Sequence, residues 1–153
     1  MQKVVEGINH YIKWLPEEYN SMSEKEISAR PLPNKWSKKE ILGHLCDSAI
    51  NNMERFIKIQ YEETVYVIQS YNQDQWVMAQ NYQGRPLDEI VNLFQTLNQQ
   101  IVNIVKNIPN EKLSSLCDIG NNQQKTLGWL IQDYFDHMEH HIHNQIITKN
   151  DDI

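Results

Sequence analysis

Three histidines in two separate segments are the residues of this chain whose types and spacing could do chemistry. His44 lies in one segment, and His137 and His141 lie in another, near the C-terminal end. Residues i and i+4 of a helix share a face, so a His-x-x-x-His pair can give two ligands to one metal ion. A third histidine from a facing helix would complete a three-nitrogen site with an open coordination position, as in catalytic metal sites. The sequence therefore predicts a site for one divalent ion at His44, His137 and His141.

Two further histidines of the same segment are predicted to take no part in this site. At about 100° per residue, His137 and His141 fall on the edge of an apolar stripe that is centred on Met138, whereas His140 and His143 fall on the solvent side. The alternative is that a locally histidine-rich helix produces such a pair by chance. In that case, each histidine at the edge of the apolar stripe is a packing or surface residue and binds no metal.

A polar row continues the line of His44 along its own segment. Its members follow His44 at spacings of four, seven and eleven residues: Ser48, Asn51 and Arg55. A polar row beside a core is costly unless it meets water, a partner side chain or a ligand. We predict that these residues bind substrate in a cavity next to the metal, where Arg55 could hold a carboxylate. The alternative is that Arg55 pairs with an acid such as Glu54 or Asp47 at the surface.

Several other kinds of site do not match the sequence. A zincin needs His-Glu-x-x-His, but Glu139 follows His137 by two positions and points about 200° away from it. A di-iron bundle needs Glu-x-x-His on two helices, and no predicted helix contains it. No phosphate loop or dinucleotide-binding glycine pattern occurs. A Ser-His-Asp or Cys-His triad stays open as an alternative, although Cys46 projects about 200° from His44 on the same helix.

Four segments with helical periodicity must position the histidines. They run from Val4 to Leu15, from Ser37 to about Gln60, from Gly84 to Pro109, and from Thr126 to about Lys149. Pro16 is expected to end or kink the first helix. Residues 23–26 read as a capping box for a short helical turn, and Ser37 with Glu40 forms a second box at the start of the His44 helix.

The stretch from Tyr61 to Gly84 is polar and aromatic, and we interpret it as a long crossover that contains some helix. No alternation of polar and apolar residues is long enough to demand a sheet. The predicted fold class is all-α, a four-helix bundle with one long crossover between helices 2 and 3, formed by a single domain over residues 1–153.

Composition narrows the function classes. The 153 residues carry a net charge of −6, with no cluster of lysine or arginine, which argues against a nucleic-acid partner. No stretch has the length of a membrane span, and the N-terminus lacks the apolar core of a signal peptide. We expect a cytoplasmic protein in which Cys46 and Cys117 are buried free thiols, with a disulfide between them left open.

Two runs of residues resemble the signatures of the DinB-like (YfiT-like) family of small metal-binding four-helix bundles. The first leads from Pro-Leu-Pro-Asn-Lys-Trp-Ser-x-x-Glu, residues 31–40, into Gly-His-Leu-x-Asp-Ser, residues 43–48. The second is Tyr-Phe-Asp-His-x-x-His-His-x-x-x-Gln-Ile, residues 134–146. The resemblance covers most of the chain, and the three metal ligands of the family map onto His44, His137 and His141. Trp36 and Gln145 look like structural parts of the two signatures.

The resemblance implies an up-down-down-up bundle, a homodimer, and one divalent ion such as zinc or nickel. Some relatives are thiol transferases or isomerases that use bacillithiol, mycothiol or glutathione. Our leading prediction is therefore a divalent-metal-dependent enzyme, either a thiol S-transferase or a related hydrolase, with a small-molecule thiol and an electrophile as its partners. The alternatives are a non-catalytic metal-binding bundle and a helical protein-interaction module.

Overall fold

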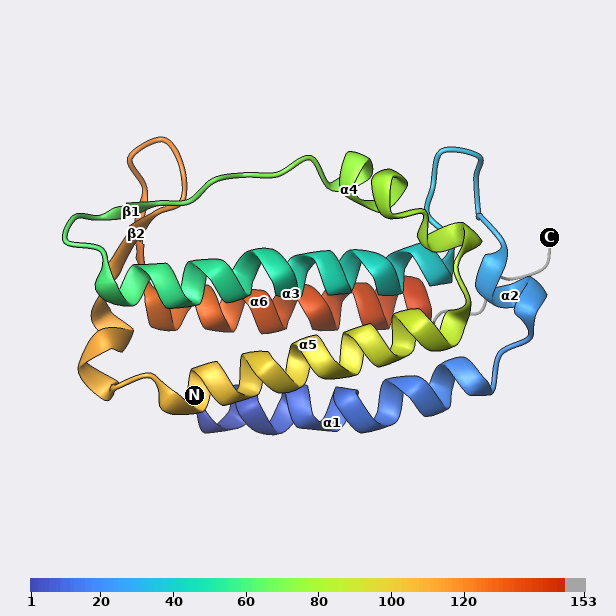
Figure 1. Ribbon diagram of the computed structural model, residues 1–153, viewed down its shortest axis with the longest axis horizontal. Coiled ribbons are helices and arrows are strands. Elements are labelled where there is room, and N and C mark those ends of the chain that lie inside the picture. The colour runs from blue at the N-terminus through green and yellow to red at the C-terminus, as the bar shows by residue number, and fades with distance from the viewer. Residues whose placement is uncertain (148–153) are drawn as a thin grey trace.

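Four long helices form the bundle, in a computed structural model that describes residues 1–147. They are α1 (Gln2–Asn20), α3 (Lys38–Tyr61), α5 (Leu87–Asn107) and α6 (Leu127–His141). Figure 1 shows that α1 and α6 run in one direction and that α3 and α5 run in the other. The order is up-down-down-up with a long connection between α3 and α5, and it confirms the predicted fold class.

Each of these helices buries an apolar stripe in a shared core. Helix α3 packs against α5 and α6, and α1 packs against the same two helices. The largest fully buried side chains come from all four helices and from the crossover: Tyr19, Tyr82, Phe56, Phe94, Ile8, Leu15, Leu42, Leu45, Ile90, Ile101, Leu127 and Ile131. Cys46 and Cys117 are both buried and unbridged. Within residues 1–147, no helix combines the length and the apolar character that crossing a membrane requires.

The first helix is longer than predicted. It continues through Pro16 to Asn20, whereas the sequence predicts its end near Leu15. Proline lacks an N–H, so the carbonyl of Ile12 loses its usual partner four residues on. The side chain of Gln95, on α5, donates to this carbonyl at 3.0 Å. A tertiary hydrogen bond therefore compensates for the proline, and a sequence pattern cannot show such a bond.

Short elements connect the long helices. Helix α2 (Glu24–Ser28) is capped by Ser23, as predicted. The crossover contains β1 (Tyr66–Val67), α4 (Gln73–Gln80) and the 3₁₀ helix η1 (Tyr82–Gly84). Another 3₁₀ helix, η2 (Asn110–Ser114), and two strands, β2 (Leu116–Asp118) and β3 (Gln124–Thr126), lie between α5 and α6.

The three strands form a small sheet that the sequence does not predict. Its order is β1-β2-β3, with Tyr66 opposite Cys117 in a parallel pair and Leu116 opposite Thr126 in an antiparallel pair. Strands of two or three residues are too short for an alternating pattern. The sheet ties the start of the crossover to the loop before α6.

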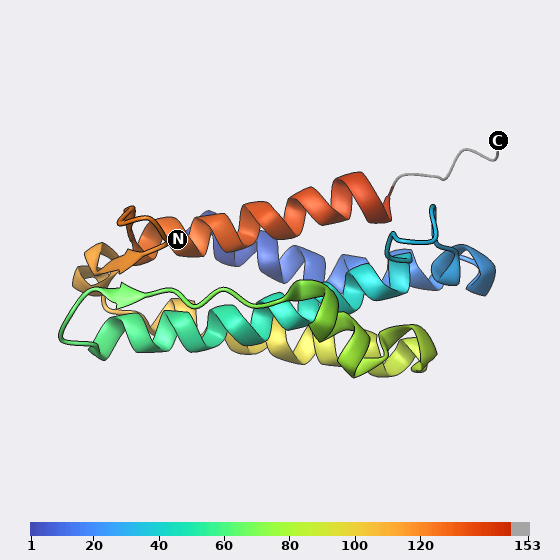
Figure 2. The ribbon, with the colours of Figure 1, turned by 90° about the horizontal axis from the view of Figure 1, so that it is seen from above.

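From this sheet the crossover runs along α3, back toward the N-terminal end of that helix (Figures 1 and 2). Arg55 of α3 donates from Nη2 to the carbonyl of Gln69 at 2.7 Å, and the Asn72 side chain caps α4. Further on, the Tyr82 hydroxyl donates to the buried carboxylate of Asp47 at 2.7 Å. A β-carbon on Gly43 would lie only 2.1 Å from the Tyr82 ring, so this approach requires glycine at position 43.

The last helix changes its winding after the histidine pair. Thr126 caps α6 by accepting a hydrogen bond from the backbone N–H of Trp129, as predicted. A π-helix, η3 (Ile142–Ile146), follows His141 directly. The predicted end near Lys149 lies outside the described residues.

Candidate metal centre

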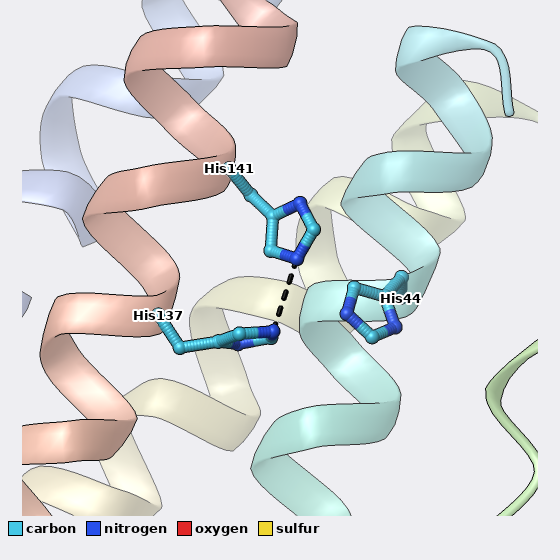
Figure 3. Close-up of side chains that lie close together, drawn as sticks. All are labelled: His44, His137 and His141. Carbon is cyan, nitrogen blue, oxygen red and sulfur yellow. Dashed lines mark hydrogen bonds between the residues drawn. The ribbon is translucent and has the colours of Figure 1, made fainter.

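Two well-defined helix starts place the three predicted ligands. The capping box at the start of α3 is present: Ser37 and Glu40 each accept a hydrogen bond from the backbone N–H of the other, at 3.1 Å. His44 lies in the second turn of this helix. His137 and His141 project from α6 toward α3, as Figure 3 shows. One ligand atom from each of the three rings lies within 4.8 Å of the other two.

The geometry within the cluster is compact. The Nε2 atoms of His137 and His141 are 3.0 Å apart. Ring centroids are separated by 4.4 Å between His137 and His141, by 4.8 Å between His44 and His141, and by 5.3 Å between His44 and His137. Because zinc–nitrogen bonds are about 2.0–2.1 Å long, two nitrogens on one ion lie at most about 4.2 Å apart. The cluster, with nitrogens within 4.8 Å of one another, therefore needs only a small rotation of the rings to ligate one ion.

His44 is buried without satisfied polar atoms. Its exposed fraction is 0%, and neither ring nitrogen has a hydrogen-bond partner among the described residues. The Trp36 ring covers it, with a centroid distance of 4.8 Å. A buried polar group that lacks a partner costs about 1–3 kcal/mol of stability. A metal ion between the three rings would supply the missing partner for one of these nitrogens.

Gln145 fixes the protonation of one ring. Its Oε1 atom accepts from Nδ1 of His141 at 2.5 Å. With the proton on Nδ1, the lone pair of His141 lies on Nε2, the atom that faces His137. Metal-ligating histidines commonly donate their other ring N–H to an acceptor of this kind. Gln145 therefore orients His141 for ligation.

The electrostatics keep the three imidazoles neutral. Burial, followed by the neighbouring histidines, lowers the pKa of His44 to about 3 and that of His137 to about 4. Burial also lowers the pKa of His141, and the hydrogen bond that its Nδ1 donates to Gln145 opposes this effect. Neutral imidazole is the form that binds metal, so at neutral pH the cluster requires no proton release before ligation.

The other two histidines of α6 and η3 have separate partners. Nδ1 of the exposed His140 lies 2.9 Å from the side-chain nitrogen of Asn144. Nε2 of His143 lies 3.1 Å from the Tyr11 hydroxyl, which donates to Glu139. Neither ring belongs to the three-histidine ligand set, although the His140 ring packs edge-on against His141 with a centroid distance of 5.6 Å.

A cavity of about 220 Å³ adjoins the cluster on the side of His137, and we call it the Arg55 cavity. Its lining comes from α3, the crossover and α6: Ser48, Asn52, Arg55, Ser70, Tyr71, Gln73, Leu130, Asp133, Tyr134 and His137. Of the predicted polar row, Ser48 and Arg55 line it. Asn51 does not, because its side chain donates to the carbonyl of Asp47 at 2.9 Å.

Arg55 has neither of the acidic partners that the surface alternative requires. It forms no ion pair with Glu54 or Asp47; Glu54 pairs with Lys58 instead. Its guanidinium donates to Gln69 O, and it lies 5.9 Å from the centroid of the Tyr71 ring. The side chain thus forms part of the cavity wall.

A second cavity, of about 420 Å³, lies on the other side of the cluster, and we call it the Trp36 cavity. Its lining includes Trp36, which covers His44, and Gln145, which holds His141. Along α3, Lys38 and Ile41 line this cavity before His44, whereas the Arg55 cavity begins after it. Of the three histidines, His137 lines the Arg55 cavity and none lines the Trp36 cavity, where the Trp36 ring that covers His44 forms part of the wall.

Sequence reasoning missed several residues of this groove. Tyr71 and Gln73 lie in the crossover, which has no periodicity to indicate its path. Asp133 was not singled out, because only the contacts between α3 and α6 show that it faces the same cavity as Arg55. The spacing of four between His141 and Gln145 is a signal that could have identified the acceptor for Nδ1.

Comparison with known proteins gives both sequence and structural relatives. The family model of the DinB superfamily matches residues 15–144. A protein of Oceanobacillus iheyensis, named as a candidate metal-dependent hydrolase, is 22% identical over 94% of this chain and 82% of its own length. A protein of Halalkalibacterium halodurans with the same description is 22% identical over 80% of this chain and 70% of its own.

Two solved structures share the fold. YfiT from Bacillus subtilis, described as a candidate metal-dependent hydrolase with an unusual four-helix bundle topology, has a TM-score of 0.81 at 19% identity. That likeness covers 92% of this chain and 81% of YfiT. The mycothiol-dependent maleylpyruvate isomerase has a TM-score of 0.73 at 9% identity, covering 97% of this chain and 62% of the isomerase. Since the family match spans most of the sequence and the topology agrees with it, the chain belongs to the DinB superfamily.

Proposed function

We propose that the protein is a metal-dependent enzyme in which His44, His137 and His141 hold one divalent ion, zinc or nickel. The observation that carries this proposal is His44, which is fully buried with two unpartnered nitrogens and lies beside two converging imidazoles. Such a residue costs stability in a purely structural role. Three neutral nitrogen ligands suit a borderline ion and leave coordination positions for a reactant.

The chain's own residues prepare this site. Gln145 holds the His141 ring in one tautomer, and Trp36 covers His44. When bound, a divalent ion lowers the pKa of a coordinated water or thiol and so provides a nucleophile at neutral pH. The partial burial of His137 and His141 limits bulk water around that nucleophile.

The reaction we propose is thiol S-transfer or a related hydrolysis. The relatives are described as metal-dependent hydrolases, and one fold neighbour uses the low-molecular-weight thiol mycothiol. Transfer needs sites for both a thiol and an electrophile, and the Arg55 cavity, which His137 lines, would hold one of them. Hydrolysis requires room for one organic substrate only.

We further propose that Ser48 and Arg55 contact the substrate in the Arg55 cavity. Arg55 supplies a planar cation that suits a carboxylate. Asn51 lies outside that lining, and the neighbouring Asn52 takes its place there. If the protein is instead a non-catalytic metal-binding bundle or a protein-interaction module, no substrate binds in this cavity.

Metal analysis followed by an activity screen tests the proposal. The purified protein should hold one divalent ion per chain, and bound cobalt or nickel should quench the fluorescence of Trp36. His137→Ala should lose the metal, whereas His140→Gln, one turn away on the same helix, should keep it. A chain that binds no divalent ion would contradict the proposal.

The activity screen separates the reactions. Metal-loaded protein is offered bacillithiol, mycothiol or glutathione together with an electrophile, and in parallel an ester or amide without thiol. Product that forms only when thiol is present supports transfer, and product without thiol supports hydrolysis. Metal binding with neither product would favour the non-catalytic bundle. The expected homodimer and cytoplasmic location stay predictions, and sedimentation at micromolar concentration tests the former.

A further inference from the structure

The Arg55 cavity carries two opposite charges that do not pair with each other. The half-buried Arg55 of α3 and the exposed Asp133 of α6 both line it. The ion pairs among residues 1–147 involve neither of them. No described residue donates a hydrogen bond to the Asp133 carboxylate. An unpaired cation and an unpaired anion thus border the same small cavity.

Arg55 is held in place on its wall and still has donors to offer. Its Nη2 atom donates to Gln69 O, and the Tyr71 ring lies beside the guanidinium. A guanidinium has five N–H donors, so one bond leaves several for a ligand. An anchored side chain also loses little conformational freedom when a ligand binds. The arrangement suits a carboxylate, which accepts two parallel hydrogen bonds.

The surroundings of Asp133 favour binding of a cation. Partial burial, followed by the negative charge of Asp136, raises the pKa of its carboxyl above the usual value. An ammonium group beside it would counter both effects. Asp136 itself accepts a hydrogen bond from Gln132 at 2.8 Å and does not line the cavity.

We propose that the Arg55 cavity binds a small zwitterion of amino-acid size, with its carboxylate on Arg55 and its ammonium on Asp133. The hydroxyl groups of Ser48 and Tyr71 lie in the same lining and can bind the polar centre of such a molecule. The volume of about 220 Å³ is below the roughly 300–1,000 Å³ of sites for drug-sized ligands. The ligand borders His137, so this inference deepens the proposed function by naming its substrate class and rests on it for any reaction.

Three matched small molecules test the proposal in the wild-type chain. L-Serine carries both charges, ethanolamine lacks the carboxylate, and 3-hydroxypropionate lacks the ammonium. NMR titrations of metal-free and zinc-loaded protein should give the tightest binding for L-serine. Each missing group should weaken binding about 10- to 100-fold, as expected for one hydrogen bond to a charged group. Equal binding of all three molecules would overturn the proposal without any variant.

Variants then assign each charge. The Arg55→Gln variant cannot hold the carboxylate, so its affinities for L-serine and ethanolamine should be equal. The Asp133→Asn variant cannot pair with the ammonium, so its affinities for L-serine and 3-hydroxypropionate should be equal. Lys58→Gln and Asp136→Asn make the same charge changes on the same helices outside the cavity, and they should keep the wild-type preference. If Asp136→Asn weakened L-serine binding as much as Asp133→Asn does, the cause would be helix charge and the proposal would fall.

Failure of this inference can be told apart from failure of the proposed function. A protein that binds zinc but does not distinguish the three molecules keeps the metal proposal and loses this one. A protein that binds no zinc but prefers L-serine through Arg55 and Asp133 keeps the zwitterion site and loses the metal proposal.

Discussion

The α1–α5 side of the bundle and helix α3 bury different kinds of side chain. Helices α1 and α5 bury tyrosine, phenylalanine and aliphatic residues, and Asn98 is their only buried amide within the described chain. Asn98 accepts a hydrogen bond from Tyr134 at 2.5 Å. In contrast, α3 and its N-cap bury seven polar or charged residues: Ser37, Lys38, Glu40, His44, Asp47, Ser48 and Asn52.

This difference locates the groups whose burial lowers the stability of the fold on α3. Burying polar groups is costly unless they are hydrogen-bonded. Most of the buried polar groups on α3 have partners: Glu40 pairs with Arg30, and Asn52 donates to Ser48 O. His44 has none. Oδ2 of Asp47 is also unpartnered, but its Oδ1 accepts from Tyr82, so His44 is the residue of this set left with no partner at all. Local rules of this kind are typically broken at functional sites.

The largest expected effect is a loss of stability on the α1–α5 side of the bundle. Phe94 of α5 is 1% exposed in the core. Phe94→Ala should lower the free energy of unfolding by about 3–5 kcal/mol, because it removes buried surface and leaves a cavity. Urea denaturation measures this loss. The protein that remains folded should still bind one metal ion per chain; loss of the metal site would show that the two regions are not independent.

Metal should stabilise the histidine side by a similar amount. With free zinc at about 100 to 1,000 times its dissociation constant, the free energy of unfolding should rise by roughly 2.7–4.1 kcal/mol. His137→Ala should abolish this gain in thermal unfolding. The double change of His140 and His143 to glutamine should preserve it, since both rings lie outside the cluster. Equal losses would mean that the ligand set is misassigned.

Gln145 should matter less than the ligands that it supports. Gln145→Leu removes the acceptor for Nδ1 of His141 and should weaken zinc affinity about 10- to 100-fold. Competition with a chelator measures the affinity. Asn144→Leu, at the adjacent exposed position, removes a hydrogen bond with His140, which is outside the ligand set, and is the control. If both variants bind zinc alike, Gln145 does not orient His141.

Helical periodicity predicts the bundle and places each of the three histidines at the edge of an apolar stripe, and the family resemblance implies that they converge. The four-residue spacing puts His137 and His141 on one face, and His44 lies beside the apolar stripe of its own helix. Which helices face each other depends on the topology of the bundle, which the family resemblance implies. The crossover was not predictable in this way. Its path depends on tertiary bonds, such as Arg55 to Gln69 and Tyr82 to Asp47, and on a sheet with strands of two or three residues. The cavity lining was therefore only partly accessible from the sequence.

His44→Met should stabilise the metal-free protein, in contrast with Phe94→Ala at an equally buried position. The change replaces two unpartnered nitrogens with an apolar side chain that adapts to irregular space. We expect the free energy of unfolding to rise by about 1–3 kcal/mol, which is the cost of an unsatisfied buried group. Metal binding should be lost at the same time. A destabilised variant would indicate that the His44 nitrogens are satisfied in solution.

The smallest expected effect, taken per pH unit, is the pH dependence of the stability of the metal-free protein. Burial lowers the pKa of His44 from 6.5 to about 3, so between these values the unfolded chain binds a proton that the folded chain does not. Stability from His44 is therefore present above pH 6.5 and is lost as the pH falls toward 3. Asp47 has the opposite sign: burial raises its pKa from 3.8 to about 6, and its contribution is lost as the pH rises through 6. His44→Met should remove only the first contribution, at most about 1.4 kcal/mol per pH unit, and leave that of Asp47. Urea denaturation at several pH values between 4 and 7 measures the slope, and an unchanged slope would show that His44 does not resist protonation in the folded chain.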